Sequence, residues 1–200
     1  MMLTAEFLKR YTAGRRSFRR AKLHEAVLAK VDLSGVNLSE ADLSGADLGQ
    51  TKLVGAKLAG ATAVGARLCN ADLSEADLRG VNFEGADLRS ARLFKADLSL
   101  AVLGRADLRA ARLRGAKLNG AFLCGANLAN ADLYEATMQR AELTAADLTE
   151  ADLRKADLSR AILTQAVLKR ANLLGAFLAR ADFSGADLTG AIMPDGATHE

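Results

Sequence analysis

Residues 41–45 read ADLSG, and the same five-residue pattern continues on both sides of them without a slip in phase. The central position, which is every fifth residue from Leu23 to Met193, is always Leu, Phe, Met or Ala. Counted over residues 21–195, 35 units carry Leu at 30 centres and Ala two residues earlier in 31. One short repeat therefore organises most of the 200 residues.

A spacing of five excludes a helix as the repeating element. An α-helix turns about 100° per residue, so leucines five apart would spread around its whole circumference. Extended backbone explains the unit, because Ala41 and Leu43 then point to one side and Asp42 points to the other. Ser44 and Gly45 are left to form a corner. Four corners of about a right angle close a coil of about 20 residues, which predicts an all-β solenoid of about nine coils spaced ~4.8 Å apart.

Corner chemistry and column composition agree with this coil length. Gly is the last residue of 13 units, where a type II turn requires positive φ. Asp or Asn before the centre is typical of a side chain that bonds backbone groups at a bend, so we expect these carboxylates to be structural. Residues 20 apart become neighbours, which places Ala63, the one Ala centre, directly beside Phe83. Such volume compensation is expected in a close-packed interior.

The units resemble those of the pentapeptide repeat family, whose consensus is Ala, Asp or Asn, Leu and two variable residues. Residues 41–45 (ADLSG), 76–80 (ADLRG) and 126–128 (ANL) match it directly, and the resemblance covers residues 21–195. It implies a right-handed quadrilateral β-helix. It also implies a binding module rather than an enzyme.

We predict three segments along the chain. Residues 1–20 form an N-terminal capping helix and a basic linker, with Leu3, Phe7, Leu8 and Tyr11 on one side of the helix and Gly14 at its end. Residues 21–195 form the β-helix, and residues 196–200 form a C-terminal tail. An open last coil invites either coverage by this tail or end-to-end homodimerisation through the C-terminal coil.

Charge and cysteine usage limit the compartment and the partners. The net charge of +3 is uneven, because residues 1–25 carry seven basic and two acidic side chains while the rest is close to neutral. No apolar run approaches the ~18 residues of a membrane span. Charged residues 6, 9 and 10 stand where a signal peptide needs an apolar core. Cys69 and Cys124 are too far apart to pair, and free thiols fit a reducing compartment. We therefore expect a cytoplasmic protein, and the family resemblance implies a bacterial one.

We expect no catalytic, cofactor-binding or metal-binding residues. His24 and His199, the two histidines, fall at opposite ends of the predicted rod, so no catalytic triad or zinc site can be built from them. Asp87 and Asp107 stack one coil apart, and a shared proton or cation is the functional alternative. Neighbouring arginines such as Arg89 favour a compensated surface.

Outward positions that depart from the repeat are the candidate binding residues. One face combines arginines with aromatic side chains, a composition enriched at interface hot spots. Its members are Arg92, Phe94, Lys95, Arg112, Arg114, Tyr134 and Arg154. A secondary apolar strip consists of Val102, Phe122, Ile162 and Phe177. The alternative is that the arginine stems only cover the aromatic rings.

These observations favour a scaffold or protein-interaction module whose flat faces bind a protein partner that the sequence does not identify. A second hypothesis follows from family members that mimic DNA and modulate DNA gyrase, but that mechanism needs a strongly negative rod. A third is a nucleic-acid-binding rod, since residues 105–117 carry five basic side chains and one acidic one. The near-neutral rod makes nucleic acid the less favoured partner.

Overall fold

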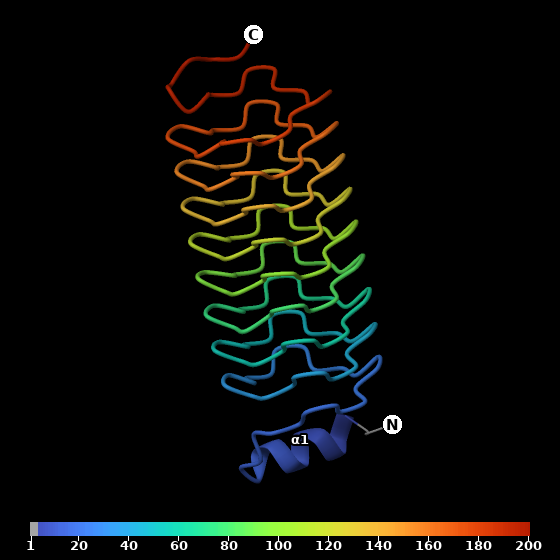
Figure 1. Cartoon of the computed structure of the whole chain (residues 1–200). Coiled ribbons are helices and arrows are strands. Elements are labelled where there is room, and N and C mark those ends of the chain that lie inside the picture. Colours follow the sequence, from blue (N-terminus) through green and yellow to red (C-terminus); the bar gives the residue numbers. More distant parts are fainter. Residues whose placement is uncertain (1–3) are drawn as a thin grey trace.

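The computed structural model describes residues 4–200, and it shows a rod of stacked coils with one helix at its amino end (Figure 1). The helix, α1 (Thr4–Thr12), lies across the first coil, and the carboxyl terminus lies at the opposite end of the rod. The coils form a right-handed quadrilateral β-helix, as predicted. Leu3, which we expected on the apolar side of the helix, lies outside the described residues.

Backbone pairing confirms the coil length of 20 residues. Parallel bridges join residues 20 apart along the rod, from Ser17 with Asn37 to Asn172 with Ile192. The backbone at the centre of each unit forms the hydrogen bonds between adjacent coils. For example, the amide of Leu43 donates to the carbonyl oxygen of Thr62 at 2.7 Å. Each side of a coil contributes a single bridging residue, so the structure contains no longer strand within residues 4–200.

The interior consists of the leucine and alanine columns that the sequence predicts. Leu43 and Leu103 are fully buried, and Ala63 and Phe83 between them are also 0 % exposed. Thr62 bridges Asn82, which confirms that Ala63 and Phe83 occupy adjacent coils. The one Ala centre is thus stacked beside a large ring, as expected for a close-packed interior.

Every corner from residue 20 to residue 190 is the same β-turn. The amide after the corner donates to the preceding central carbonyl, as from Ala46 to Leu43 at 2.9 Å, and the last turn residue has positive φ. Glycine is therefore favoured there, yet 22 of these positions carry another residue, such as Leu100 with φ 60°. The glycine corners could be predicted from the sequence. The left-handed backbone conformation of the non-glycine residues at the other corners could not.

The Asp and Asn residues before the centres stabilise the turns, as predicted. Asp42 accepts a hydrogen bond from the amide of Ser44 at 3.0 Å, and Asn82 accepts the equivalent bond from Glu84 at 2.9 Å. Asp and Asn are thus interchangeable for this bond, because it uses only the Oδ1 acceptor.

Thr51 is the one polar side chain that is fully buried among residues 4–200, and its hydroxyl donates to the Leu28 carbonyl at 2.7 Å. Val31 also donates to that carbonyl, at 3.3 Å. We expect Thr51→Val to lower the free energy of unfolding by about 1 kcal/mol, because the shape is kept and only one hydrogen bond is lost. Urea unfolding followed by circular dichroism measures this change, and a loss above about 3 kcal/mol would show that the hydroxyl does more than bond Leu28.

The helix covers the apolar interior of the first coil. Phe7 is fully buried, and its ring centroid lies 4.5 Å from that of Phe18. The basic cluster that follows contacts its own surroundings, because the Arg16 guanidinium lies 4.2 Å from the Tyr11 ring and Arg19 and Arg20 both bond Glu40 at 2.6 Å. These contacts place Arg16, Arg19 and Arg20 against the helix and the first coils.

The C-terminal tail folds back on the last coil. Thr198 pairs antiparallel with Ile192, and the amide of Gly190 donates to the His199 carbonyl at 2.8 Å. The apolar side chains of the last coil that remain only partly buried include Leu178, Phe183, Leu188 and Met193. The tail therefore covers part of this end, and the end-to-end homodimer stays a prediction.

Candidate partner-binding face

Stacking places the predicted arginines and aromatic residues on one side of the rod. Arg92 bridges Arg112, and Phe94 and Tyr134 follow the centres of the same side two coils apart. We call this surface the partner face, defined by Arg92, Phe94, Lys95, Arg112, Arg114, Tyr134 and Arg154. All of them except the half-buried Tyr134 are exposed.

Tyr134 is enclosed by cations. The guanidinium carbon of Arg114 lies 4.2 Å from the centre of the Tyr134 ring, that of Arg154 lies 5.6 Å away, and Lys155 Nζ lies 5.3 Å away. Lys155 was missed by the sequence analysis, although its position 20 residues after Glu135 could have indicated it. Around this ring the arginine stems act as a cover, which is the alternative that the sequence left open.

Phe94 and Arg112 remain open to solvent. Phe94 is 40 % exposed, and Lys95 Nζ lies 5.0 Å from the centre of its ring. A shallow hollow of about 190 Å³ lies beside the ring, and its lining residues are Arg92, Phe94, Arg112, Arg114 and Asp132. An apolar ring beside a hollow lined by guanidinium groups suits an aromatic or carboxylate side chain of a partner.

Ion pairing leaves part of the face with free positive charge. Arg92 Nε lies 3.5 Å from Asp72, and Arg154 bonds Asp152 at 2.6 Å. Within residues 4–200, neither Arg112 nor Arg114 has a carboxylate oxygen within 4.0 Å. The hollow is therefore bordered by two arginines that form no ion pair among residues 4–200, and Asp132 is the one carboxylate in its lining.

The predicted secondary strip is not one continuous patch. Val102 and Phe122 are adjacent, but Glu142 separates Phe122 from Ile162 in the same column, and Phe177 lies on a different side above Asp157. Phe122, Ile162 and Phe177 are 42 %, 39 % and 63 % exposed, whereas Val102 is half-buried. The sequence placed these residues outward correctly, and the structure brings only Val102 and Phe122 together.

The stacked carboxylates form a compensated ladder. Arg89 donates to both oxygens of Asp87 at 2.8 Å, and Arg109 does the same for Asp107, with its shortest bond at 2.7 Å. Arg89 also lies 3.8 Å from Asp107, so the column of Arg89 and Arg109 runs beside the column of Asp87 and Asp107 and pairs with it. These bonds from arginine lower the pKa of the Asp87 and Asp107 carboxyls. A lowered pKa is the opposite of what a general acid needs near neutral pH.

Other reactive groups are dispersed. Cys69 is half-buried and Cys124 exposed, and both are free thiols. Across residues 4–200 there is no group of three or more His, Cys, Asp or Glu side chains with the geometry to hold a metal ion. The described part of the chain also has no helix that is both long and apolar enough to cross a membrane.

Comparison with known proteins identifies the repeat. The family model described as pentapeptide repeats matches with eight copies, over residues 17–53, 51–89, 91–128, 106–144, 126–165 and 161–195. The chain therefore belongs to the pentapeptide repeat family. No curated protein matches it.

Two solved structures illustrate the similarity. One is HetL of the cyanobacterium Nostoc sp. strain PCC 7120, described as a pentapeptide repeat protein involved in heterocyst differentiation regulation; it is 34 % identical over 100 % of both chains, with a TM-score of 0.56. The other is QnrB1, a plasmid-mediated fluoroquinolone resistance protein, which is 24 % identical over 75 % of each chain with a TM-score of 0.53. The second likeness concerns the fold alone.

Proposed function

We propose that the protein is a non-enzymatic interaction module of the bacterial cytoplasm, which binds a protein partner through the partner face. The observation that carries the proposal is the exposed Phe94 ring beside a hollow bordered by the unpaired Arg112 and Arg114. Aromatic and arginine side chains at the centre of a surface are the ones that most often dominate binding energy.

The full-length similarity to HetL supports this proposal. That protein is involved in regulating a differentiation process, and a repeat rod without an assembled catalytic constellation in its described residues would regulate by binding. The DNA-mimic hypothesis has less support, because ladder carboxylates such as Asp87 and Asp107 are paired with the arginines two residues on. A mimic of duplex DNA needs those charges free.

We expect a triple variant of the partner face, Phe94→Ala, Arg112→Glu and Tyr134→Ala, to lose a protein that the native chain retains from a nuclease-treated lysate of its host. Glu142 occupies a position equivalent to that of Arg112, so the charge reversal suits the backbone. Quantitative mass spectrometry of the retained proteins measures the loss, which should be at least about tenfold if hot-spot contacts are removed.

The control changes an exposed apolar residue and an arginine elsewhere, with Val27→Ala and Arg105→Glu on other sides of the rod. This control should retain the partner at the native level. Equal retention by all three proteins would move the binding site away from the partner face, and retention by none would contradict the proposal. A supercoiling assay with DNA gyrase then distinguishes the DNA-mimic alternative.

A further inference from the structure

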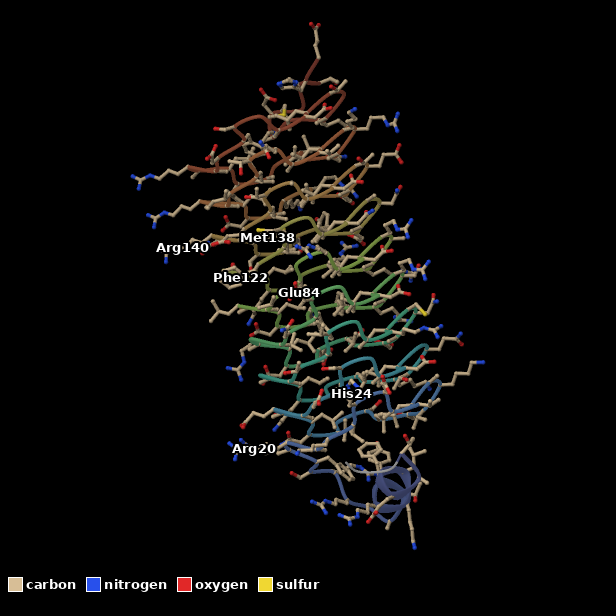
Figure 2. All side chains as sticks on the ribbon, turned by 90° about the vertical axis from the view of Figure 1, so that its right-hand side faces the viewer. Arg20, His24, Glu84, Phe122, Met138 and Arg140 are labelled. Carbon is tan, nitrogen blue, oxygen red and sulfur yellow. The ribbon has the colours of Figure 1, made fainter. Side chains whose placement is uncertain are left out.

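One corner of the rod carries a stack of arginines that lies outside the partner face. The last turn residues of five successive coils on this corner are Leu100, Gly120, Arg140, Arg160 and Arg180. We call this stack the arginine corner. Its three arginines are exposed, and Figure 2 shows Arg140 extending from the edge of the rod with Phe122 on the same side.

The arginines of this corner lack the partner that other corner cations have. Arg20 occupies the same column at the amino end and bonds Glu40 of the next coil at 2.6 Å. On another corner, Arg170 bonds Glu150 of the preceding coil at 2.6 Å. Arg140, Arg160 and Arg180 have only each other and Gly120 as column neighbours, and none forms an ion pair within residues 4–200.

Two carboxylates that are close to these arginines in sequence, Asp157 and Asp182, accept hydrogen bonds from other residues. Asp157 accepts hydrogen bonds from Gln139 Nε2 at 2.5 Å and from the Ser159 amide at 2.9 Å. Asp182 accepts from the Ser184 hydroxyl at 2.6 Å and from the Ser184 amide at 2.9 Å. Glu142 stands between Phe122 and Ile162 in the adjoining column. The corner therefore presents three arginines that form no ion pair among residues 4–200.

A groove runs along the same corner. It encloses about 590 Å³, and its lining residues are Leu100, Asn119, Gly120, Gln139, Arg140, Ser159 and Arg160. The missing side chain at Gly120 opens it, since a Cβ there would lie 3.0 Å from Leu100 Cδ2. Three uncharged polar side chains thus line a groove that has Leu100 at one end and arginines at the other.

Apolar side chains border the groove. Leu100 is 63 % exposed, although it is held at a φ of 60° where glycine is favoured. Phe122 and Ile162 follow the corner by two residues and are 42 % and 39 % exposed. Guanidinium groups with apolar neighbours suit a ligand that is itself both acidic and apolar along one side.

The spacing of the row matches an α-helix that lies along the rod. Coils repeat every ~4.8 Å, so the Cα atoms of Arg140 and Arg180 are separated by about 9.6 Å. Carboxylates at positions i, i+3 and i+7 of a helix span about 10.5 Å at 1.5 Å per residue. The flexible arginine stems absorb the difference of about 1 Å, and the adjacent helix stripe then faces Leu100, Phe122 and Ile162.

We propose that the arginine corner binds an acidic amphipathic helix of a protein partner, at a site separate from the partner face. Nucleic acid would use the arginines through its phosphates but would leave the apolar border without contacts. The nearby carboxylates Glu142, Asp157 and Asp182 would also repel a continuous phosphate chain, whereas a helix can place its acidic residues opposite the arginines alone.

The test uses the full chain and a labelled peptide of about 18 residues, which makes about five helical turns. In the peptide, Glu residues stand alternately three and four positions apart, and Leu residues form the adjacent stripe of the helix. We expect saturable binding by fluorescence anisotropy that weakens as salt is raised. The double variant Arg140→Gly and Arg160→Gly should bind at least about tenfold more weakly, because two charge-assisted contacts are removed.

Glycine suits these positions, since it occupies the equivalent turn position of Gly120 and many other corners, so the double variant should fold. Its matched control, Lys30→Gly and Arg105→Gly, removes the same charge from two other corners with φ of 63° and 55° and should bind as the native chain does. The partner-face triple variant should also bind normally, which separates this proposal from the function proposed above.

Three results would overturn the proposal. The first is that a peptide of the same composition in scrambled order binds the native chain as tightly as the amphipathic one. The second is that a labelled DNA duplex binds more tightly than the peptide. The third is that the two double variants lose affinity equally. Each would show that net charge or a different macromolecule, rather than an acidic helix, accounts for the surface.

Discussion

Replacing Phe83 by Ala should lower the free energy of unfolding by about 3 to 5 kcal/mol, the largest effect that we expect from a single substitution in this rod. Phe83 is fully buried, and its neighbour in the preceding coil is Ala63. The variant would therefore place two small side chains together in the interior. The backbone ladder holds the coil spacing, so the cavity cannot close easily.

Urea unfolding followed by circular dichroism tests this expectation, with Phe94→Ala as the control. Phe94 is 40 % exposed, so its removal should change stability by only about 0.5 kcal/mol. A loss below about 1 kcal/mol for Phe83→Ala would show that the coils collapse around the missing ring.

A pair of compensating substitutions tests the contact between positions 63 and 83. Ala63→Leu alone should destabilise by about 1 to 3 kcal/mol, because the added side chain meets the Phe83 ring. Ala63→Leu combined with Phe83→Leu rebuilds the leucine column found elsewhere, as at Leu68 and Leu88, and should recover stability to within about 1.5 kcal/mol. Additive losses in the double variant would contradict the inferred contact between positions 63 and 83.

The neighbours of each interior residue could be predicted because the period is short and uninterrupted. Once the coil was assigned 20 residues, the pairing of Ala63 with Phe83 and the outward direction of Asp42 followed from counting. The conformation of the corners did not follow fully, since residues such as Leu100 and Arg140 give no local signal for positive φ. There the ladder bonds of the coil, as from Arg140 to Ser159 at 3.1 Å, override the local preference.

The positions of the candidate surface residues could be predicted from the sequence, but the contacts of their side chains could not. The repeat places Phe94 and Tyr134 outward on one side, yet their different exposure depends on which long side chains lie over each ring. Lys155 and Arg114 cover Tyr134, whereas Phe94 has Lys95 at 5.0 Å and stays 40 % exposed. Rotamers of exposed lysine and arginine are not encoded in the period, so the structure was needed to separate a covered ring from an open one.

Acid is expected to unfold the rod through the same carboxylates that hold its corners. Hydrogen bonds from the arginine two residues on lower the pKa of Asp87, Asp107 and Asp152, and bonds from Thr189 lower the pKa of Asp187 to about 2. A carboxyl group with a lowered pKa in the folded state stabilises that state above its unfolded pKa of about 4. This contribution is lost as the pH falls through the folded pKa, so the urea midpoint should be flat from pH 7 to about 5 and fall between about 4 and 2.

The variant Asp87→Asn, Asp107→Asn and Asp152→Asn tests whether these groups cause the acid response. Asn keeps the Oδ1 acceptor of the turn, as Asn82 and Asn127 already do, but it has no charge for the arginine and does not titrate. We expect the variant to be less stable than the native chain at pH 7 and to lose less stability between about pH 4 and 2, so that the two curves converge in acid. Because the pairs are partly exposed and solvent screens them, the difference at pH 7 should also shrink in high salt. Parallel curves would instead place the acid sensitivity in other carboxylates, such as Asp187 in the last coil.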